Sequence, residues 1–157
     1  FNIPTILTTS FEDGPNGPMV PEIKAAFPDA PYFARPGQIN AWDNEDFVNA
    51  VKATGKKQLL IAGIVTEVCV AFPTLSAIEE GFDVFVVTDA SGTHSQVTRD
   101  GAWSRMQAAG AQLVNWFAVA GELHRDWRND IEGFGGILAS HVPHYANLMQ
   151  SFDSQQK

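Results

Sequence analysis

The residue best suited to covalent chemistry is the single cysteine of the chain, Cys69. It follows the apolar run 58–63, which has the pattern of a buried strand, and falls in the first turn of a helix predicted over 66–80. Unpaired N–H groups at a helix start favour an anion, so this position favours the nucleophilic thiolate and could also hold the oxyanion of a tetrahedral intermediate. The alternative is that Cys69, flanked by apolar residues, is a small hydrophobic core residue.

A second candidate, Arg35, ends the short apolar segment 32–35 just before Pro36-Gly37. Its side chain is therefore expected at the carboxyl end of a strand. A cation there could favour the thiolate of Cys69 and stabilise developing negative charge. The alternative is an ordinary surface ion pair with one of the 18 acidic residues.

The sequence offers no obvious group to accept the proton of the thiol. Asp89 follows the predicted strand 82–88, but the run Asp-Ala-Ser-Gly favours a turn or a helix cap. The histidines are dispersed, at positions His94, His124, His141 and His144. Without a second cysteine or a tight histidine and carboxylate cluster, we expect no structural zinc site. The glycine-rich run 133–136 lacks the lysine and the preceding strand of a phosphate-binding loop.

These residues need a scaffold that brings the ends of several strands together. β-Branched and apolar runs predict strands, and amphipathic segments bounded by caps and glycines predict helices. The expected strands are 3–10, 32–35, 58–63, 82–88 and 111–117. The expected helices are 21–27, 66–80, 99–109 and 118–127, with a further one that is capped by Asp43 or Asn44 and ends at Gly55. This alternation predicts an α/β fold, with a parallel sheet, helices on both faces and a ligand site at the carboxyl ends of the strands.

The composition favours one globular domain spanning 1–157, since 45% of the 157 residues are hydrophobic and 18% are charged. A net charge of −8 argues against nucleic acid and anionic membranes as partners. One cysteine allows no internal disulfide, which favours a cytoplasmic location. The longest segment without a formal charge, 133–152, contains histidine, proline and amide side chains and is not expected to span a bilayer.

Several separated blocks resemble one known family. The blocks Gly63-Ile-Val-Thr-Glu-Val-Cys-Val70 and Ala77-Ile-Glu-Glu-Gly-Phe-Asp-Val84 are similar to those of the isochorismatase-like cysteine hydrolases. The blocks 40–47 and 122–130 resemble the YcaC-type bacterial members of that family. The resemblance extends nearly from end to end and implies a three-layer α/β/α fold around a central, mostly parallel sheet.

The family uses an aspartate, a lysine or arginine, and a cysteine for catalysis. The resemblance assigns Cys69 as the nucleophile and Arg35 as the basic residue. It also implies a cis peptide bond at Ile64-Val65, which turns the N–H groups of Val65 and Cys69 toward the substrate oxygen as an oxyanion hole. Loop position and resemblance together suggest a substrate pocket formed by Phe11, Asn40, Trp42 and Thr66.

Two features depart from the family pattern. The family aspartate ends a first strand that would precede Phe1, and the chain opens in an apolar run without a Met. We therefore expect the first strand and helix to be missing from this sequence, and a chain without that aspartate to be nearly inert. The metal-dependent relatives carry histidine near the loop that corresponds to 11–18, which contains none here, so no catalytic metal and no other cofactor is expected.

The favoured function is hydrolysis of a small carboxamide through a thioester on Cys69. The alternative is an oligomeric assembly or small-molecule binding module in which this cysteine is vestigial or redox-sensing. The resemblance implies a homo-oligomer, commonly an octamer, and the tail 129–157 is expected to make oligomer contacts. The aromatic residues Trp116, Trp127, Phe134 and Tyr145 could supply such interfaces or fill the chain's own core.

Overall fold

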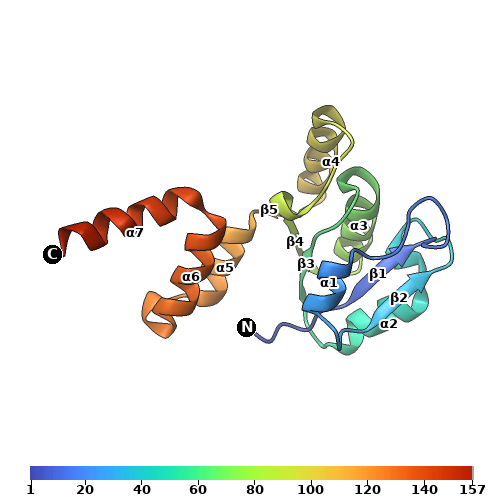
Figure 1. The fold of residues 1–157 in the computed structure, drawn as a ribbon. Coiled ribbons are helices and arrows are strands. Elements are labelled where there is room, and N and C mark those ends of the chain that lie inside the picture. The colour runs from blue at the N-terminus through green and yellow to red at the C-terminus, as the bar shows by residue number, and fades with distance from the viewer. Residues whose placement is uncertain (157) are drawn as a thin grey trace. The chain divides into compact units, whose positions relative to one another are not determined.

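The computed structural model describes residues 1–156 and divides into two compact units, the first comprising Phe1–Trp116 and the second beginning at Phe117. In Figure 1 the first unit runs from blue to yellow and the second from orange to red. The first unit contains every residue proposed for the site, from Phe11 to Cys69. The second contains the expected tail 129–157, whose role in oligomer contacts stays a prediction.

All strand pairs of the first unit are parallel, which confirms the predicted α/β class. Strand β1 (Leu7–Ser10) pairs with β2 (Tyr32–Arg35), with Thr8 opposite Phe33 and Ser10 opposite Arg35. Strands β3 (Gln58–Ile61), β4 (Asp83–Val87) and β5 (Gln112–Val114) form a second sheet in the order β3-β4-β5. The prediction of one sheet was too simple, because alternating apolar residues indicate a strand but do not specify its lateral partner.

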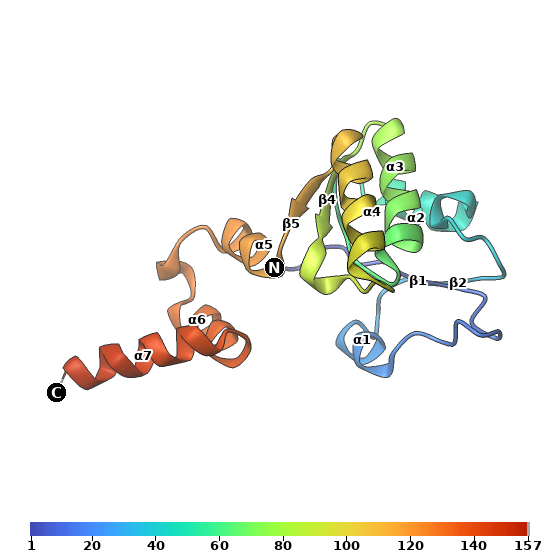
Figure 2. The same ribbon diagram turned by 90° about the horizontal axis from the view of Figure 1, so that it is seen from above.

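The helices of the first unit begin at recognisable caps. The side chain of Asn44 accepts a hydrogen bond from Phe47 N at the start of α2 (Glu45–Ala53). A reciprocal capping box between Ser95 and Thr98 starts α4 (Gln96–Ala108). The shorter α1 spans Pro21–Ala26 and α3 spans Ala71–Glu79. Helices α3 and α4 pack side by side, with α3 against β4 and α4 against β5 (Figure 2).

The core of the first unit lies between these helices and the sheet β3-β4-β5. Its fully enclosed members include Val84, Val86 and Met106, and partly buried Leu59 and Ile61 pack against it. On the opposite face of β3, Leu60 remains 44% exposed. Since successive residues of a strand point to opposite faces, this face of β3 is open in the described chain.

Several predicted boundaries differ from the structure. The strand expected over 3–10 is confined to β1, Leu7–Ser10. The segment expected as a helix over 66–80 is helical, but it begins as a π-helical turn, Thr66–Val70, before α3. The helix expected at 99 starts at Gln96, because the Ser95 cap lies further upstream. The strand expected over 111–117 is confined to β5, and Trp116 instead begins α5 (Trp116–His124), where the Asp89 carboxylate accepts a hydrogen bond from Trp116 N at 2.8 Å.

The second unit is helical and has an aromatic core of its own. After a short 3-10 turn at Trp127–Asn129, it contains α6 (Ile131–His141) and α7 (Pro143–Gln155). His124 stacks on Phe134 with ring centroids 4.1 Å apart, and Trp127 stacks on Tyr145 at 6.0 Å. Trp127, Phe134 and Tyr145 therefore pack within their own unit, one of the two roles the sequence left open.

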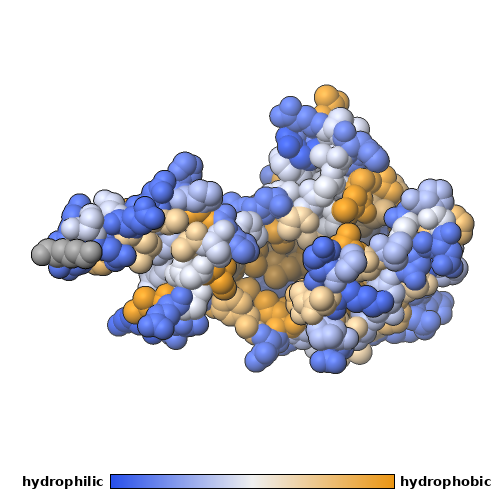
Figure 3. Space-filling model, viewed as in Figure 1, coloured by the Kyte–Doolittle hydropathy of each residue, from blue (hydrophilic) through white to orange (hydrophobic). Residues whose placement is uncertain are grey.

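Helix α7 also carries exposed apolar side chains. Leu148 is 62% exposed and Phe152 is 56% exposed, one helical turn apart, with Met149 beside them. Figure 3 shows apolar residues at the surface of both units in the face that it displays. Among residues 1–156, no helix is both long and apolar enough to cross a membrane.

Candidate active site

Cys69 lies in the π-helical turn Thr66–Val70, which connects the region after β3 to the start of α3. The turn is closed by hydrogen bonds from Val68 N and Val70 N to Val65 O, each 3.2 Å long. The cysteine is partly buried and is not disulfide-bonded. The Ile64-Val65 peptide bond that precedes this turn is cis, as the resemblance implied.

A second loop holds this turn in place from the side. Thr66 donates from both its backbone N and its hydroxyl to Gly92 O, each at 2.7 Å, and Gly92 N donates to Gly63 O at 3.0 Å. The Glu67 carboxylate accepts from the Thr93 hydroxyl at 2.9 Å. The loop between β4 and α4 therefore fixes the backbone on which Val65 and Cys69 lie.

The Glu67 carboxylate is stabilised as an anion. Burial raises its pKa, but hydrogen bonds from its own backbone N–H, from the Thr93 hydroxyl and from His94 N outweigh burial, so its pKa lies below the ordinary value. His94 N donates to it at 3.3 Å. Nothing in the sequence near Glu67 indicated this role, because its partners lie about 26 residues further along the chain.

Arg35 is the last residue of β2, as predicted, but its side chain is only 4% exposed. Its Nε donates to Thr8 Oγ1 at 2.9 Å, and its Nη1 donates to the backbone oxygens of Gln38 and Ile39. No ion pair within residues 1–156 includes Arg35, so the surface ion pair considered as the alternative does not form. All of its hydrogen-bond acceptors are neutral.

The charge of Arg35 interacts with the site of the cysteine. Burial lowers the pKa of Arg35 from its ordinary value, while negative charge at Cys69 and at Asp43 raises it. The structure thus brings Arg35 and Cys69 within electrostatic reach, although they are separated by 34 positions (69 − 35) in the sequence. A buried cation without a carboxylate partner is a receptor for an anion.

Phe11 lies beside Arg35 at the end of β1. Its backbone N donates to Arg35 O at 2.8 Å, its φ of 54° is left-handed, and its side chain is 51% exposed. The Thr9 and Tyr32 hydroxyls both contact the Glu12 carboxylate, which anchors the following loop. These two hydrogen bonds lower the pKa of Glu12, while burial and then the bond to Glu12 raise the pKa of Tyr32.

The other predicted pocket residues have defined structural partners. Asn40 donates to Ser76 Oγ at 3.0 Å, and Trp42 packs edge-on against Phe47 and Phe82. The Thr66 side chain is fully buried. A part in substrate binding stays a prediction for each of these three, as it does for Phe11.

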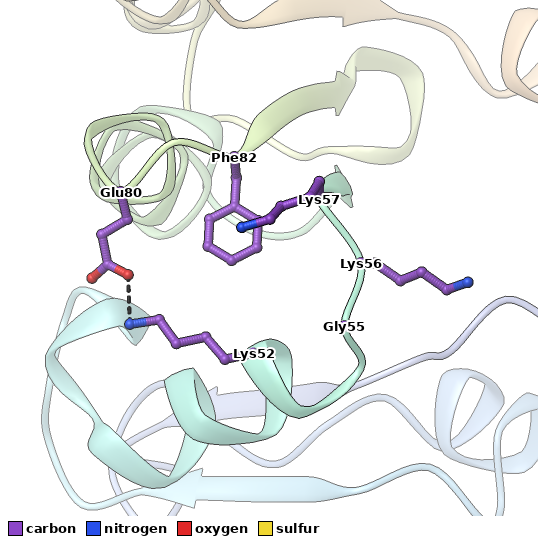
Figure 4. Close-up of a pocket in the computed structure, with 6 residues that line it drawn as sticks. All are labelled: Lys52, Gly55, Lys56, Lys57, Glu80 and Phe82. Carbon is purple, nitrogen blue, oxygen red and sulfur yellow. Dashed lines mark ion pairs between the residues drawn. The ribbon is translucent and has the colours of Figure 1, made fainter.

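A separate cavity of about 330 Å³ lies at the opposite edge of the sheet (Figure 4). It is formed where α2 leads into β3 and where α3 leads into β4, and its lining residues are Lys52, Gly55, Lys56, Lys57, Glu80 and Phe82. An ion pair of 2.7 Å neutralises Lys52 with Glu80, and the Lys56 side chain points away from the cavity. Because Cys69 follows the carboxyl end of β3, this cavity is not part of the cysteine site.

The structure gives Asp89 the structural role that the sequence favoured, at the start of α5. No group of three or more His, Cys, Asp or Glu side chains within residues 1–156 is arranged to hold a metal ion. Thr8, the acceptor for Arg35, could not be identified from the sequence. Its strand was predicted, but nothing in the sequence showed that this strand pairs with the one that ends at Arg35.

Comparison with known proteins places these features in a family. The isochorismatase domain matches residues 7–117. The Escherichia coli protein described as probable hydrolase YcaC is 74% identical over all 157 residues, which span 76% of its length. Its crystal structure, described as an octameric hydrolase of unknown specificity, matches 98% of this chain with a TM-score of 0.94.

A Pseudomonas aeruginosa YcaC structure, described as carrying hexane-2,5-diol and covalent acrylamide, is 80% identical. It matches 97% of this chain and 75% of its own chain with a TM-score of 0.94. The domain match covers more than half of the sequence and includes both Arg35 and Cys69. The chain therefore belongs to the isochorismatase family.

Proposed function

We propose that this hydrolase-family chain acts on a small carboxamide through a thioester on Cys69. The observation that carries the proposal is the Arg35 guanidinium, which is buried, bonded only to neutral acceptors and within electrostatic reach of Cys69. A buried positive charge stabilises a thiolate and any anion that the thiolate forms on a substrate. A cysteine that merely filled the core would not need such a neighbour.

The proposed reaction has two halves. The Cys69 thiolate bonds to the amide carbon, and the carbonyl electrons move to oxygen, where the N–H groups of Val65 and Cys69 hold the oxyanion. When this tetrahedral intermediate collapses, the C–N bond breaks. The amide nitrogen takes up the proton that the thiol lost and leaves as ammonia. Water then adds to the thioester, the C–S bond breaks, and a carboxylic acid and the cysteine are released. The resemblance assigns these proton transfers to the family aspartate, which has no counterpart among residues 1–157, so turnover is proposed only where that aspartate is supplied.

Two similarities support this assignment. Acrylamide is an electrophile that reacts with nucleophilic thiols, and the P. aeruginosa relative is described with acrylamide covalently attached. Cys69 is the single cysteine of this chain, so it is the thiol that such a reagent would meet. The E. coli relative is described as a hydrolase of unknown specificity, and the carboxamide class is our own assignment.

The test is the rate at which acrylamide and iodoacetamide label the purified protein between pH 5 and pH 10, with the site located by mass spectrometry and glutathione as the unactivated reference thiol. At pH 7 we expect Cys69 to be labelled at least about tenfold faster than glutathione, because an activated thiol is the better nucleophile. Cys69→Ala should abolish labelling. Labelling of Cys69 no faster than that of glutathione would contradict the proposal and favour a binding module with a vestigial cysteine.

We also propose that the chain forms a homo-oligomer, as large as an octamer, through its helical tail. The exposed side chains Leu148, Met149 and Phe152 give α7 an apolar stripe, and the E. coli relative is described as octameric. Leu148→Glu combined with Phe152→Glu should reduce the mass measured by light scattering. Val97→Glu, at an 83% exposed position of α4, is the matched control. A monomeric parent chain would refute the assembly.

A further inference from the structure

The guanidinium of Arg35 is held along two of its edges. Nε donates to Thr8 Oγ1 at 2.9 Å, and Nη1 donates to Gln38 O and Ile39 O, the latter at 3.3 Å. Nη2 has no hydrogen-bond partner within residues 1–156. Since a guanidinium is rigid and planar, fixing Nε and Nη1 also fixes the direction in which Nη2 presents its N–H groups.

Thr8 is suited to orient this group. It lies in β1 opposite Phe33, and because side chains alternate along a strand, it shares a face with Arg35, two residues beyond Phe33. The Thr8 hydroxyl donates its proton to Phe33 O at 2.8 Å, which leaves an oxygen lone pair for Arg35 Nε. The hydroxyl is therefore held in the orientation that accepts from the arginine.

We propose that Thr8 is a positioning residue, acting through Arg35 Nε so that the unfilled Nη2 edge of the guanidinium faces the anion formed at the cysteine site. The inference rests on the proposed function, which supplies that anion. It explains why a planar arginine suits this position: the single ammonium of a lysine cannot donate to Thr8, Gln38 and Ile39 and still present a further fixed donor edge. Thr8 itself need not contact the substrate.

The principal variant is Thr8→Val, which keeps the shape of the side chain and removes the acceptor. At pH 7 we expect Cys69 to be labelled by acrylamide roughly threefold to tenfold more slowly than in the parent chain, because the placement of the cation is lost while its charge remains. Thr8→Ser restores the hydroxyl and should return the rate to within about twofold of the parent. Both variants are compared with the parent chain across the same pH range.

Thr9→Val is the matched control. Thr9 lies in the same strand, but its hydroxyl contacts Glu12 at 2.7 Å and Tyr32 at 3.0 Å, not Arg35. Its loss should leave the pH dependence of labelling unchanged. If Thr9→Val slows labelling as much as Thr8→Val does, or if Thr8→Ser fails to restore the rate, the strand as a whole is responsible and the inference is wrong.

A double variant separates action through Arg35 from a purely structural effect. In an Arg35→Met background, where residue 35 has no donor for Thr8, adding Thr8→Val should not change the labelling rate further. This background also avoids leaving a buried Nε without an acceptor, so the comparison holds even if Thr8→Val alone unfolds. An additional slowing in the double variant would overturn the inference. The proposed function fails separately, when Cys69 of the parent chain is labelled no faster than glutathione at pH 7.

Discussion

Removal of the Arg35 charge is the most informative perturbation of this site. Arg35→Met keeps an unbranched side chain in a position that is 4% exposed but removes the buried cation. It leaves the Thr8 hydroxyl oxygen and the backbone oxygens of Gln38 and Ile39 without their donor. Loss of stability is therefore expected, partly offset because a charge no longer has to be buried.

The effect on Cys69 can be estimated from the electrostatics. A positive charge near a reacting sulfur stabilises the anion that attacks the reagent, and about 1.4 kcal/mol of such stabilisation corresponds to tenfold in rate. We therefore expect iodoacetamide to label Arg35→Met about tenfold more slowly than the parent at pH 7.

The assay is a labelling time course at each pH, read by intact mass. Arg105→Met is the matched control, because Arg105 lies on the exposed side of α4, with its guanidinium over the Phe72 ring at 5.8 Å. Circular dichroism confirms that each variant is folded. Equal rates for Arg35→Met and the parent at pH 7 would refute the reasoning that Arg35 activates the cysteine.

Three further predictions concern the fold around the site. Hydrogen bonds from the Tyr32 and Thr9 hydroxyls hold the pKa of Glu12 below its ordinary value, so this carboxyl contributes stability that is present above its unfolded pKa, about 4.3, and lost as pH falls through the lower folded pKa. Tyr32→Phe should therefore reduce the difference in unfolding free energy between pH 6 and pH 3, measured by urea titration, and an unchanged difference would contradict this. Replacing the fully buried Met106 by Ala should lower the free energy of unfolding by about 2 to 5 kcal/mol, measured by urea titration. A smaller decrease would mean that α4 packs loosely. Asp89→Ala should lower the free energy of unfolding by about 1 kcal/mol, as is typical of a lost helix cap. Asp89→Asn keeps an acceptor oxygen and should retain most of that free energy in the same assay.

Local signals in the sequence correctly predicted much of the scaffold. Pro36 and Gly37 end the strand that places Arg35 at its carboxyl end, since proline disfavours continuation of regular structure. Gly55 and Gly81 follow α2 and α3 with φ values of 67° and 86°, a conformation that glycine adopts without a steric penalty. The position of Cys69 in the helical turn that follows the strand 58–61 was visible for the same reason, although that strand is open on one face rather than buried on both. These features depend on residues within a few positions of one another.

The tertiary structure alone decided how those elements act on one another. The pairing of β1 with β2 brings Thr8 to Arg35, and the approach of the loop at Gly92 fixes the turn that carries Cys69. The burial of Arg35 without a carboxylate partner was equally invisible, and so was the contact between Asp89 and Trp116 that starts α5. Strand and helix propensities arise from local sterics and hydrogen bonding, whereas these contacts join segments about 26 or 27 residues apart. Which of those segments meet depends on the packing of the whole unit, and that is why the sequence pointed to Cys69 and Arg35 but not to the neighbours that hold them.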